Sequence, residues 1–180
     1  MTNVEGKIFL AKEVVCWNTP AEKEEGVAVL KHEYRHTLDE WVPTLRYNVP
    51  AGDTSRAARQ ARAMNDFFQA ARYVSEARAY MYEIAHLLDI ATMTPVLAPE
   101  LEARIDFIHR KICWNIRCAL AYLSRGLMEL DSLPGGPDFS DWAAMGHGTY
   151  PLSVAQEVQS DIETLNDELQ TAEALMDLVY

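Results

Sequence analysis

Two histidines and a glutamate lie at a spacing that suits a metal-dependent hydrolase. Residues 32–36 read H-E-Y-R-H, which is an H-E-x-x-H pattern. If this segment is helical, residues four apart share one face, so His32 and His36 can bind one zinc ion. Glu33 can then accept a proton from a water that the metal activates and pass it to the leaving amine. The pattern predicts a zinc site with Glu33 as the general base.

A catalytic zinc also needs a third protein ligand and an open fourth position. Residues 37–42 contain neither glycine nor histidine, so the extended G-x-x-H continuation is missing and the ligand has to come from another helix. We choose Glu76, within V-S-E-A-R-A-Y at residues 74–80. The predicted metal ligands are therefore His32, His36 and Glu76, and the predicted cofactor is Zn²⁺.

These two motifs, H-E-x-R-H at residues 32–36 and E-A-x-A at residues 76–79, resemble those of compact gluzincins. They are especially similar to little-characterised metallopeptidase domains of bacteria and phages, in which H-E-x-R-H is followed by E-A-D-A. The resemblance covers about residues 7 to 90, half of the chain. It implies a minimal zincin whose zinc is held by His32, His36 and Glu76, with Glu33 as the base and a peptide bond as the substrate.

The chain departs from that family pattern after the third ligand. Arg78 stands where an acidic residue is expected, and Tyr80 stands where gluzincins often carry an aspartate four residues after the ligand. Metal-bound histidines usually donate their second ring N–H to an acceptor. We expect Glu83, Asp39 or a backbone carbonyl to supply it.

A catalytic site of this kind also needs a donor that faces the developing oxyanion. His147 and Tyr150 lie in a glycine-bearing segment, G-H-G-T-Y at residues 146–150, and are chemically suitable. We predict them as further catalytic residues.

Two other classes of protein compete with the hydrolase. Glu33-x-x-His36, Glu83-x-x-His86 and Asp106-x-x-His109 resemble the paired motifs that hold two iron ions in ferritin-like helical bundles. The third class is a non-catalytic, acidic helical module that binds a partner protein.

Composition narrows the remaining possibilities. The 180 residues suit a single domain, and the net charge of −11 argues against a nucleic-acid-binding protein. The arginines between residues 56 and 72 are expected to form a solvated helix face. Three cysteines, Cys16, Cys113 and Cys118, show no spacing typical of disulfides or of a Cys-type zinc site. No secretory signal or membrane-spanning run is visible, so we expect a cytoplasmic protein. The metallopeptidase resemblance implies that its substrate is a protein or peptide.

Patterning predicts a mainly α fold of four to five helices with a small N-terminal strand element. Thr19-Pro20-Ala21-Glu22 is a capping box that starts a helix running to about Trp41, with a core stripe at Leu30, Tyr34, Leu38 and Trp41. Short strands are expected at 7–10 and 14–17. A second helix is expected from Asp53 or Ser55 to about Ile90, with a break near Asp66, and further helices are expected at 99–131 and 153–178. We interpret residues 1–180 as one domain, with 7–92 as the metallopeptidase-like core and the last two helices packed on it.

The last helix repeats apolar residues at alternating spacings of four and three. These residues are Val158, Ile162, Leu165, Leu169, Ala172, Met176 and Val179. Such a seam is typical of a coiled coil, but it covers only about three heptads. We expect it to pack on the chain's own helices, with a homodimer through this helix as the alternative.

Overall fold

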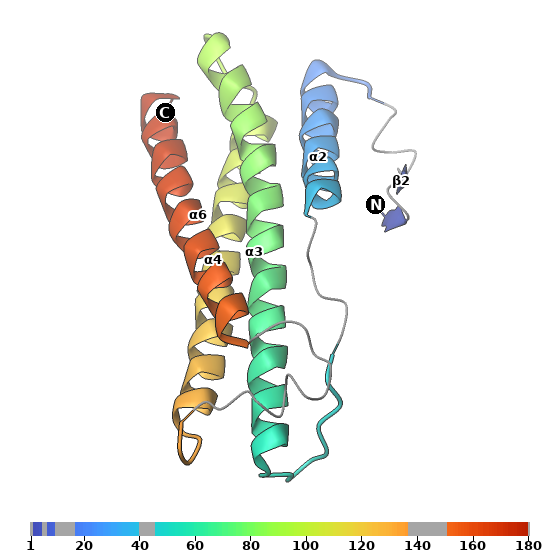
Figure 1. Cartoon of the computed structure of the whole chain (residues 1–180). Helices are drawn as coiled ribbons and strands as arrows, with labels where there is room; N and C mark the ends of the chain where they lie inside the picture. The colour runs from blue at the N-terminus through green and yellow to red at the C-terminus, as the bar shows by residue number, and fades with distance from the viewer. Residues whose placement is uncertain (1, 5–6, 10–16, 40–45, 137–150, 180) are drawn as a thin grey trace. The chain divides into compact units, whose positions relative to one another are not determined.

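In the computed structural model, the fold is mainly α, as predicted. The structure describes residues 2–4, 7–9, 17–39, 46–136 and 151–179. Most of these residues belong to four helices (Figure 1), namely α2 (Pro20–Leu38), α3 (Arg56–Met93), α4 (Pro99–Asp131) and α6 (Pro151–Val179).

The predicted N-terminal strand element is not supported in the form expected. The structure has two three-residue strands, β1 (Thr2–Val4) and β2 (Lys7–Phe9), which pair antiparallel with Thr2 opposite Phe9. The strand expected at 14–17 lies outside the described residues except for Trp17, which is not in a strand. The hairpin is therefore a local contact between neighbours in sequence.

Helix α2 starts as its capping box predicts. The Thr19 hydroxyl accepts a hydrogen bond from the Glu22 amide at 3.1 Å, and the Glu22 carboxylate accepts from the Thr19 amide at 3.2 Å. The helix ends at Leu38, earlier than expected, and Trp41 lies outside the described residues.

The predicted core stripe of α2 is wrong. Tyr34 and Leu38 are 53% and 44% exposed, whereas Ala28 and His32 are buried. At 100° per residue, His32 points about 200° away from Tyr34. The buried face of α2 therefore carries the histidine motif.

Helix α3 is continuous over 38 residues, so the break predicted near Asp66 is wrong. It contains no glycine or proline, and ten of its residues are alanine, the strongest helix former. The Asp66 carboxylate accepts two hydrogen bonds from Arg125. One comes from Nε, at 2.7 Å, and the other comes from Nη2. An aspartate bound in this way does not compete for the helix backbone, and so it does not interrupt the helix.

The last two helices follow the sequence pattern closely. Helix α4 has the predicted bounds, and α6 extends the predicted range by two residues at the start and one at the end. Five residues of the heptad-like seam are buried within the single chain: Val158, Ile162, Leu165, Leu169 and Ala172. This burial agrees with packing on the chain's own helices, and the homodimer stays a prediction.

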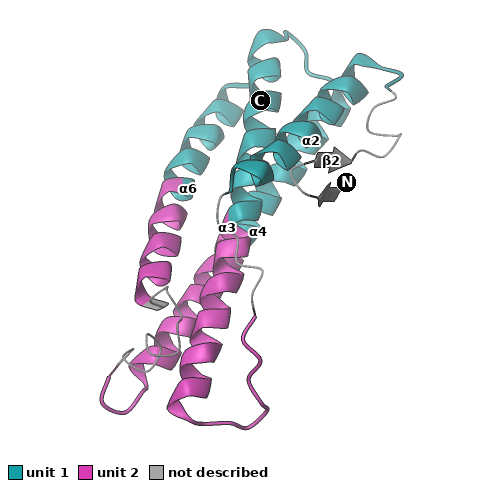
Figure 2. Ribbon diagram, turned by 45° about the vertical axis from the view of Figure 1, so that its right-hand side comes forward, with its two compact units in different colours: residues 1–40, 75–115, 165–180 teal, residues 41–74, 116–164 magenta. Residues whose placement is uncertain are grey.

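The chain divides into two compact units that are both assembled from distant segments (Figure 2). Unit 1 comprises residues 1–40, 75–115 and 165–180, and unit 2 comprises residues 41–74 and 116–164. The predicted single domain, with a metallopeptidase-like core at 7–92 and additional packing helices, stays a prediction. Both the H-E-x-x-H segment and Glu76 belong to unit 1.

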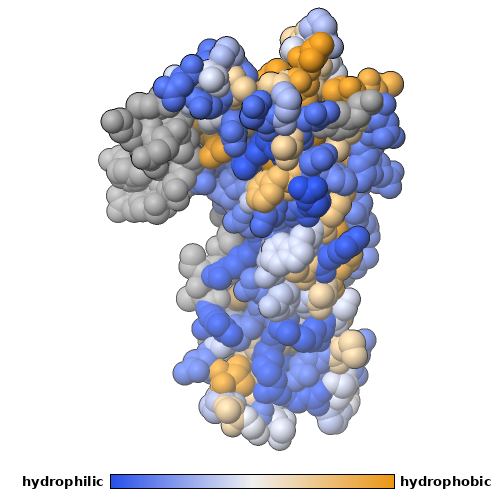
Figure 3. Space-filling view, turned by 180° about the vertical axis from the view of Figure 1, so that it is seen from behind, coloured by the Kyte–Doolittle hydropathy of each residue, from blue (hydrophilic) through white to orange (hydrophobic). Residues whose placement is uncertain are grey.

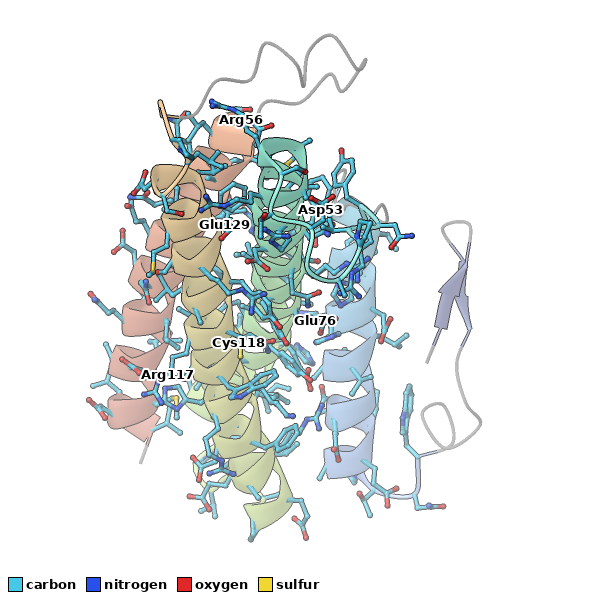
Figure 4. The ribbon with its side chains drawn as sticks, turned by 90° about the horizontal axis from the view of Figure 1, so that it is seen from below. Asp53, Arg56, Glu76, Arg117, Cys118 and Glu129 are labelled. Atoms are coloured by element: carbon cyan, nitrogen blue, oxygen red, sulfur yellow. The ribbon has the colours of Figure 1, made fainter. Side chains whose placement is uncertain are left out.

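The arginines of unit 2 do not form the simple solvated face expected from the sequence. Arg59 Nε and Arg62 Nη2 lie 3.2 Å and 3.0 Å from Glu129 Oε1 on α4. Arg56 donates to the carbonyl oxygens of Pro134, at 3.0 Å, and Gly136 (Figure 4). These arginines connect the start of α3 to the end of α4.

The face of the molecule shown in Figure 3 is largely hydrophilic, with smaller apolar areas between the hydrophilic ones. Among the described helices, none has an apolar stretch of the length needed to cross a membrane.

Candidate metal centre

The structure brings the three predicted metal ligands together in unit 1. Ligand atoms of His32, His36 and Glu76 all lie within 4.8 Å of one another. His32 Nε2 is 3.8 Å from Glu76 Oε2, and His36 Nε2 is 3.6 Å from Glu76 Oε1. The two imidazoles come from α2 and the carboxylate from α3, which Figure 4 shows on the side of α3 towards α2.

These separations suit a small tetrahedral cation. Zinc bonds of about 2.0–2.1 Å place neighbouring ligand atoms about 3.4 Å apart. The two observed distances to Glu76 exceed that spacing by only a few tenths of an ångström. The three side chains also leave an open side, since Glu76 is 48% exposed at its side chain, against 11% for His32. A catalytic zinc site requires such an open position.

The Nε2 atom of His32 is the ring nitrogen that faces Glu76. Its Nδ1 lies 3.3 Å from Glu83 Oε2, and Glu83 is 1% exposed. That approach does not have hydrogen-bond geometry, so Nδ1 is a buried nitrogen without a hydrogen-bond partner. The other oxygen of Glu83 accepts from Arg104 Nε at 2.8 Å, which compensates the buried charge. The ring of Tyr80 contacts His32 edge-on, with ring centroids 4.4 Å apart.

His36 has the same division of roles between its two nitrogens. Its Nδ1 is 3.2 Å from Ser75 Oγ, and the Ser75 hydroxyl donates to Asp39 Oδ2. The other oxygen of Asp39 accepts from Arg35 Nη1 at 2.6 Å. A chain of this kind orients an imidazole and leaves Nε2 free to bind a cation. Asp39 and Glu83, both named from the sequence as acceptors, therefore lie beside the two histidines.

Glu33 is half-buried on α2, next to His32. Burial raises the pKa of the Tyr80 hydroxyl, and the negative charges of Glu76, Glu83 and Glu33 raise it further, against the lowering effect of Arg104. The carboxylate of Glu33 therefore acts electrostatically on the same Tyr80 that contacts His32.

The two predicted oxyanion donors, His147 and Tyr150, lie outside the described residues and stay predictions. Sequence reasoning missed Ser75 and Arg104 as supporting residues. Ser75 immediately precedes Glu76, so its position beside the site follows from the same helix. Arg104 is distant in sequence, and no local pattern indicates that it pairs with Glu83.

The structure does not bring the ferritin-like pairs together. His86 Nε2 lies 3.2 Å from Glu24, and His109 Nε2 lies 2.8 Å from Glu173. Within the described residues, only two groups of potential ligands converge, and neither combines two of the E-x-x-H or D-x-x-H pairs. The geometry offers no support for a di-iron centre.

Comparison with family models, with curated proteins and with solved structures finds no match to this chain. The gluzincin resemblance therefore stays a prediction from two short motifs, and the functional argument depends on the geometry of the site.

Proposed function

We propose that this protein is a zinc-dependent hydrolase, acting on peptide bonds. The observation that carries the proposal is the approach of His32, His36 and Glu76 to a common point from two helices. Both histidines present Nε2 to that point, while their Nδ1 atoms lie near Glu83 and Ser75. In protein zinc sites the second ring nitrogen usually donates a hydrogen bond, as Nδ1 of His36 can do to Ser75.

In this proposal, His32, His36 and Glu76 would hold a zinc ion, which would supply polarisation of the scissile carbonyl and a lower pKa for a bound water. Glu33 accepts the proton of the attacking water and transfers it to the leaving amine. The Ser75–Asp39 pair holds the His36 imidazole in one tautomer and orientation, and the buried carboxylate of Glu83 lies beside Nδ1 of His32. Tyr80 restricts the rotation of the His32 ring. The exposed side of Glu76 leaves room for an extended peptide to approach.

The charge around the site supports a cation rather than an anion. Glu76 is a carboxylate whose ion-pair partners, in the described part of the chain, are the two imidazoles. Neutral imidazoles present lone pairs beside a negative carboxylate, and a divalent cation stabilises all three groups at once. The alternative, two protonated histidines, would put two positive charges with ring centroids only 5.0 Å apart.

The deciding experiment combines elemental analysis with a peptidase assay on purified, tag-free protein. We expect His32→Ala and Glu76→Ala each to bind one zinc equivalent fewer than the wild type. Glu33→Gln should keep this zinc but lower cleavage of a peptide library about 10²–10⁴-fold, because only the general base is lost. His86→Ala is the matched control, since it removes a histidine that pairs with Glu24 outside the site.

Retention of all bound zinc in both His32→Ala and Glu76→Ala would overturn the metal site. Metal loss in His86→Ala to the same extent would instead favour a di-iron arrangement. Zinc-dependent cleavage unchanged by Glu33→Gln would contradict the role of Glu33.

A further inference from the structure

A second group of potential metal ligands lies elsewhere in unit 1. Ligand atoms of His109, Cys113 and Glu173 lie within 4.8 Å of one another. His109 and Cys113 are four residues apart on α4 and so share a face, and Glu173 reaches them from α6. None of these residues belongs to the proposed catalytic site.

The three ligand atoms converge on one point rather than forming a relay. His109 Nε2 is 2.8 Å from Glu173 Oε1, and the same nitrogen is 3.7 Å from Cys113 Sγ. A nucleophile–histidine–acid triad uses the two different ring nitrogens, one for each partner. Here one nitrogen faces both the sulfur and the carboxylate. This arrangement suits ligands that share a cation and does not suit a cysteine nucleophile.

The chemistry and spacing favour zinc. Bonds of about 2.3 Å to sulfur and 2.0–2.1 Å to nitrogen place the two atoms about 3.6 Å apart in a tetrahedral site. The observed separation of 3.7 Å agrees with this value, whereas the Glu173 oxygen, 2.8 Å from Nε2, has to move away by about 0.6 Å to bind the same ion. A cysteine thiolate and a glutamate carboxylate together neutralise a divalent cation, and the imidazole adds no charge. Thiolate and imidazole ligands select zinc over magnesium or calcium.

We propose that His109, Cys113 and Glu173 form a second zinc site, which ties the C-terminal part of α6 to α4. Water completes the coordination, because the Glu173 side chain is 47% exposed and that of His109 is 26% exposed. Because a thiolate and not a thiol binds the metal, zinc would displace the proton of the Cys113 thiol. The site is independent of the proposed hydrolase activity.

Cobalt titration of the reduced, metal-free protein tests this proposal directly. Co²⁺ replaces Zn²⁺ in such sites, and a Co²⁺–thiolate bond gives a charge-transfer band in the near ultraviolet that nitrogen and oxygen ligands do not give. We expect this band in the wild type, its loss in Cys113→Ser and its weakening in Glu173→Gln. His36→Gln should keep the band, which separates this site from the proposed catalytic centre.

Cys118→Ser is the matched control, because Cys118 lies five residues along the same helix and belongs to no group of converging ligands among the described residues (Figure 4). A band that persists in Cys113→Ser, or that is lost in Cys118→Ser, would overturn the proposal. So would the absence of any thiolate band in the wild type. Circular dichroism of each variant checks that the helices are retained.

A second readout uses the thiol itself. Zinc should slow alkylation of Cys113 at least about tenfold, measured by peptide mass spectrometry, because the metal-bound sulfur no longer acts as a free thiolate. Alkylation of Cys118, whose pKa is raised by burial, should be slow with and without zinc. An equal rate for Cys113 in both conditions contradicts the site.

Discussion

The acidic residues on the helices of the two units have different kinds of partner. In unit 2, Asp66 binds Arg125, and Glu129 binds Arg59 and Arg62. In unit 1, Glu76 faces two imidazoles instead. An arginine is always protonated, so an arginine–carboxylate pair is complete in itself. An imidazole can be neutral and offer a lone pair, so a carboxylate with two imidazoles can bind a cation.

Unit 1 also contains a pair of the first kind, which serves as an internal reference. Glu83 is buried against Arg104, and its second oxygen faces His32. The comparison therefore indicates that arginine-paired acids hold the helices together, while the histidine-facing acid is available for chemistry.

The largest expected change in the free energy of unfolding comes from breaking the buried ion pair between Glu83 and Arg104. Arg104→Ala leaves Glu83 with an uncompensated charge at 1% exposure, and such a loss costs about 3–5 kcal/mol. For a chain of this size, that corresponds to a fall in Tm of about 10 °C. Arg110→Ala, at an exposed position of the same helix, should change the free energy of unfolding by less than about 0.5 kcal/mol. If thermal denaturation gave the same fall in Tm for Arg104→Ala and Arg110→Ala, the ion pair between Glu83 and Arg104 would not be buried.

The next prediction concerns stabilisation by zinc, which should depend on the site where Glu76 faces two histidines and not on the arginine-paired acids. In the Cys113→Ser background, zinc at about 100 times its Kd should stabilise the protein by about 2.7 kcal/mol, because zinc binds only the folded site. Adding His36→Gln should abolish this increase, as measured by calorimetry. A zinc-dependent increase that survives His36→Gln would place the stabilising metal elsewhere.

A third prediction concerns helix packing in unit 2. A Cβ at Gly126 on α4 would lie 2.5 Å from Cε1 of Phe67, whose ring is completely buried. Gly126→Ala should therefore destabilise the protein by about 1–2 kcal/mol, since overpacking outweighs the gain in helix propensity. Ser124→Ala, at an exposed position of α4, gives the propensity gain without the clash. Urea denaturation of both variants measures the difference, and a Gly126→Ala variant as stable as Ser124→Ala would contradict the close approach.

The last prediction concerns the pH dependence of the free energy of unfolding that Glu129 contributes through its pairs with Arg59 and Arg62. Burial raises the pKa of Glu129, but hydrogen bonds from Arg62 and Arg59 outweigh burial, and the net pKa is lowered from 4.5. The stabilisation is therefore complete above pH about 4.5 and is lost as pH falls through the lower, folded-state pKa. Glu129→Gln should cost about 1–2 kcal/mol at neutral pH and progressively less on acidification. A cost that is independent of pH would show that packing, and not charge, explains the loss.

Local patterns in the sequence predict the helices well and their exposed faces poorly. The Thr19 capping box, Pro99 and the apolar spacing of the last two helices determine where helices begin and end. The face of α2 was misjudged because its apolar residues, Tyr34 and Leu38, are exposed while His32 is buried. A polar face that packs inward breaks the usual pattern of a surface helix.

The sequence predicts only those site residues that belong to short motifs with helical spacing. His32, His36 and Glu76 follow from short motifs, but Arg104 and the His109–Cys113–Glu173 group depend on contacts between separate helices. The H-x-x-x-C spacing at residues 109–113 was a local signal, but Glu173 lies 60 residues further along the chain. Single-sequence patterns do not show which helices become neighbours.

The unbroken course of α3 limits how the chain can change in length. Ser75, Glu76, Tyr80 and Glu83 occupy consecutive turns of one helix, so inserting a single residue among them would turn the later ones by about 100°. Residues 46–55, which precede α3 and are not helical, are under no such periodic constraint and can grow or shrink in number. Distant relatives would then retain two blocks of fixed length, H-E-x-x-H and S-E-x₃-Y-x₂-E, separated by a spacer of variable length.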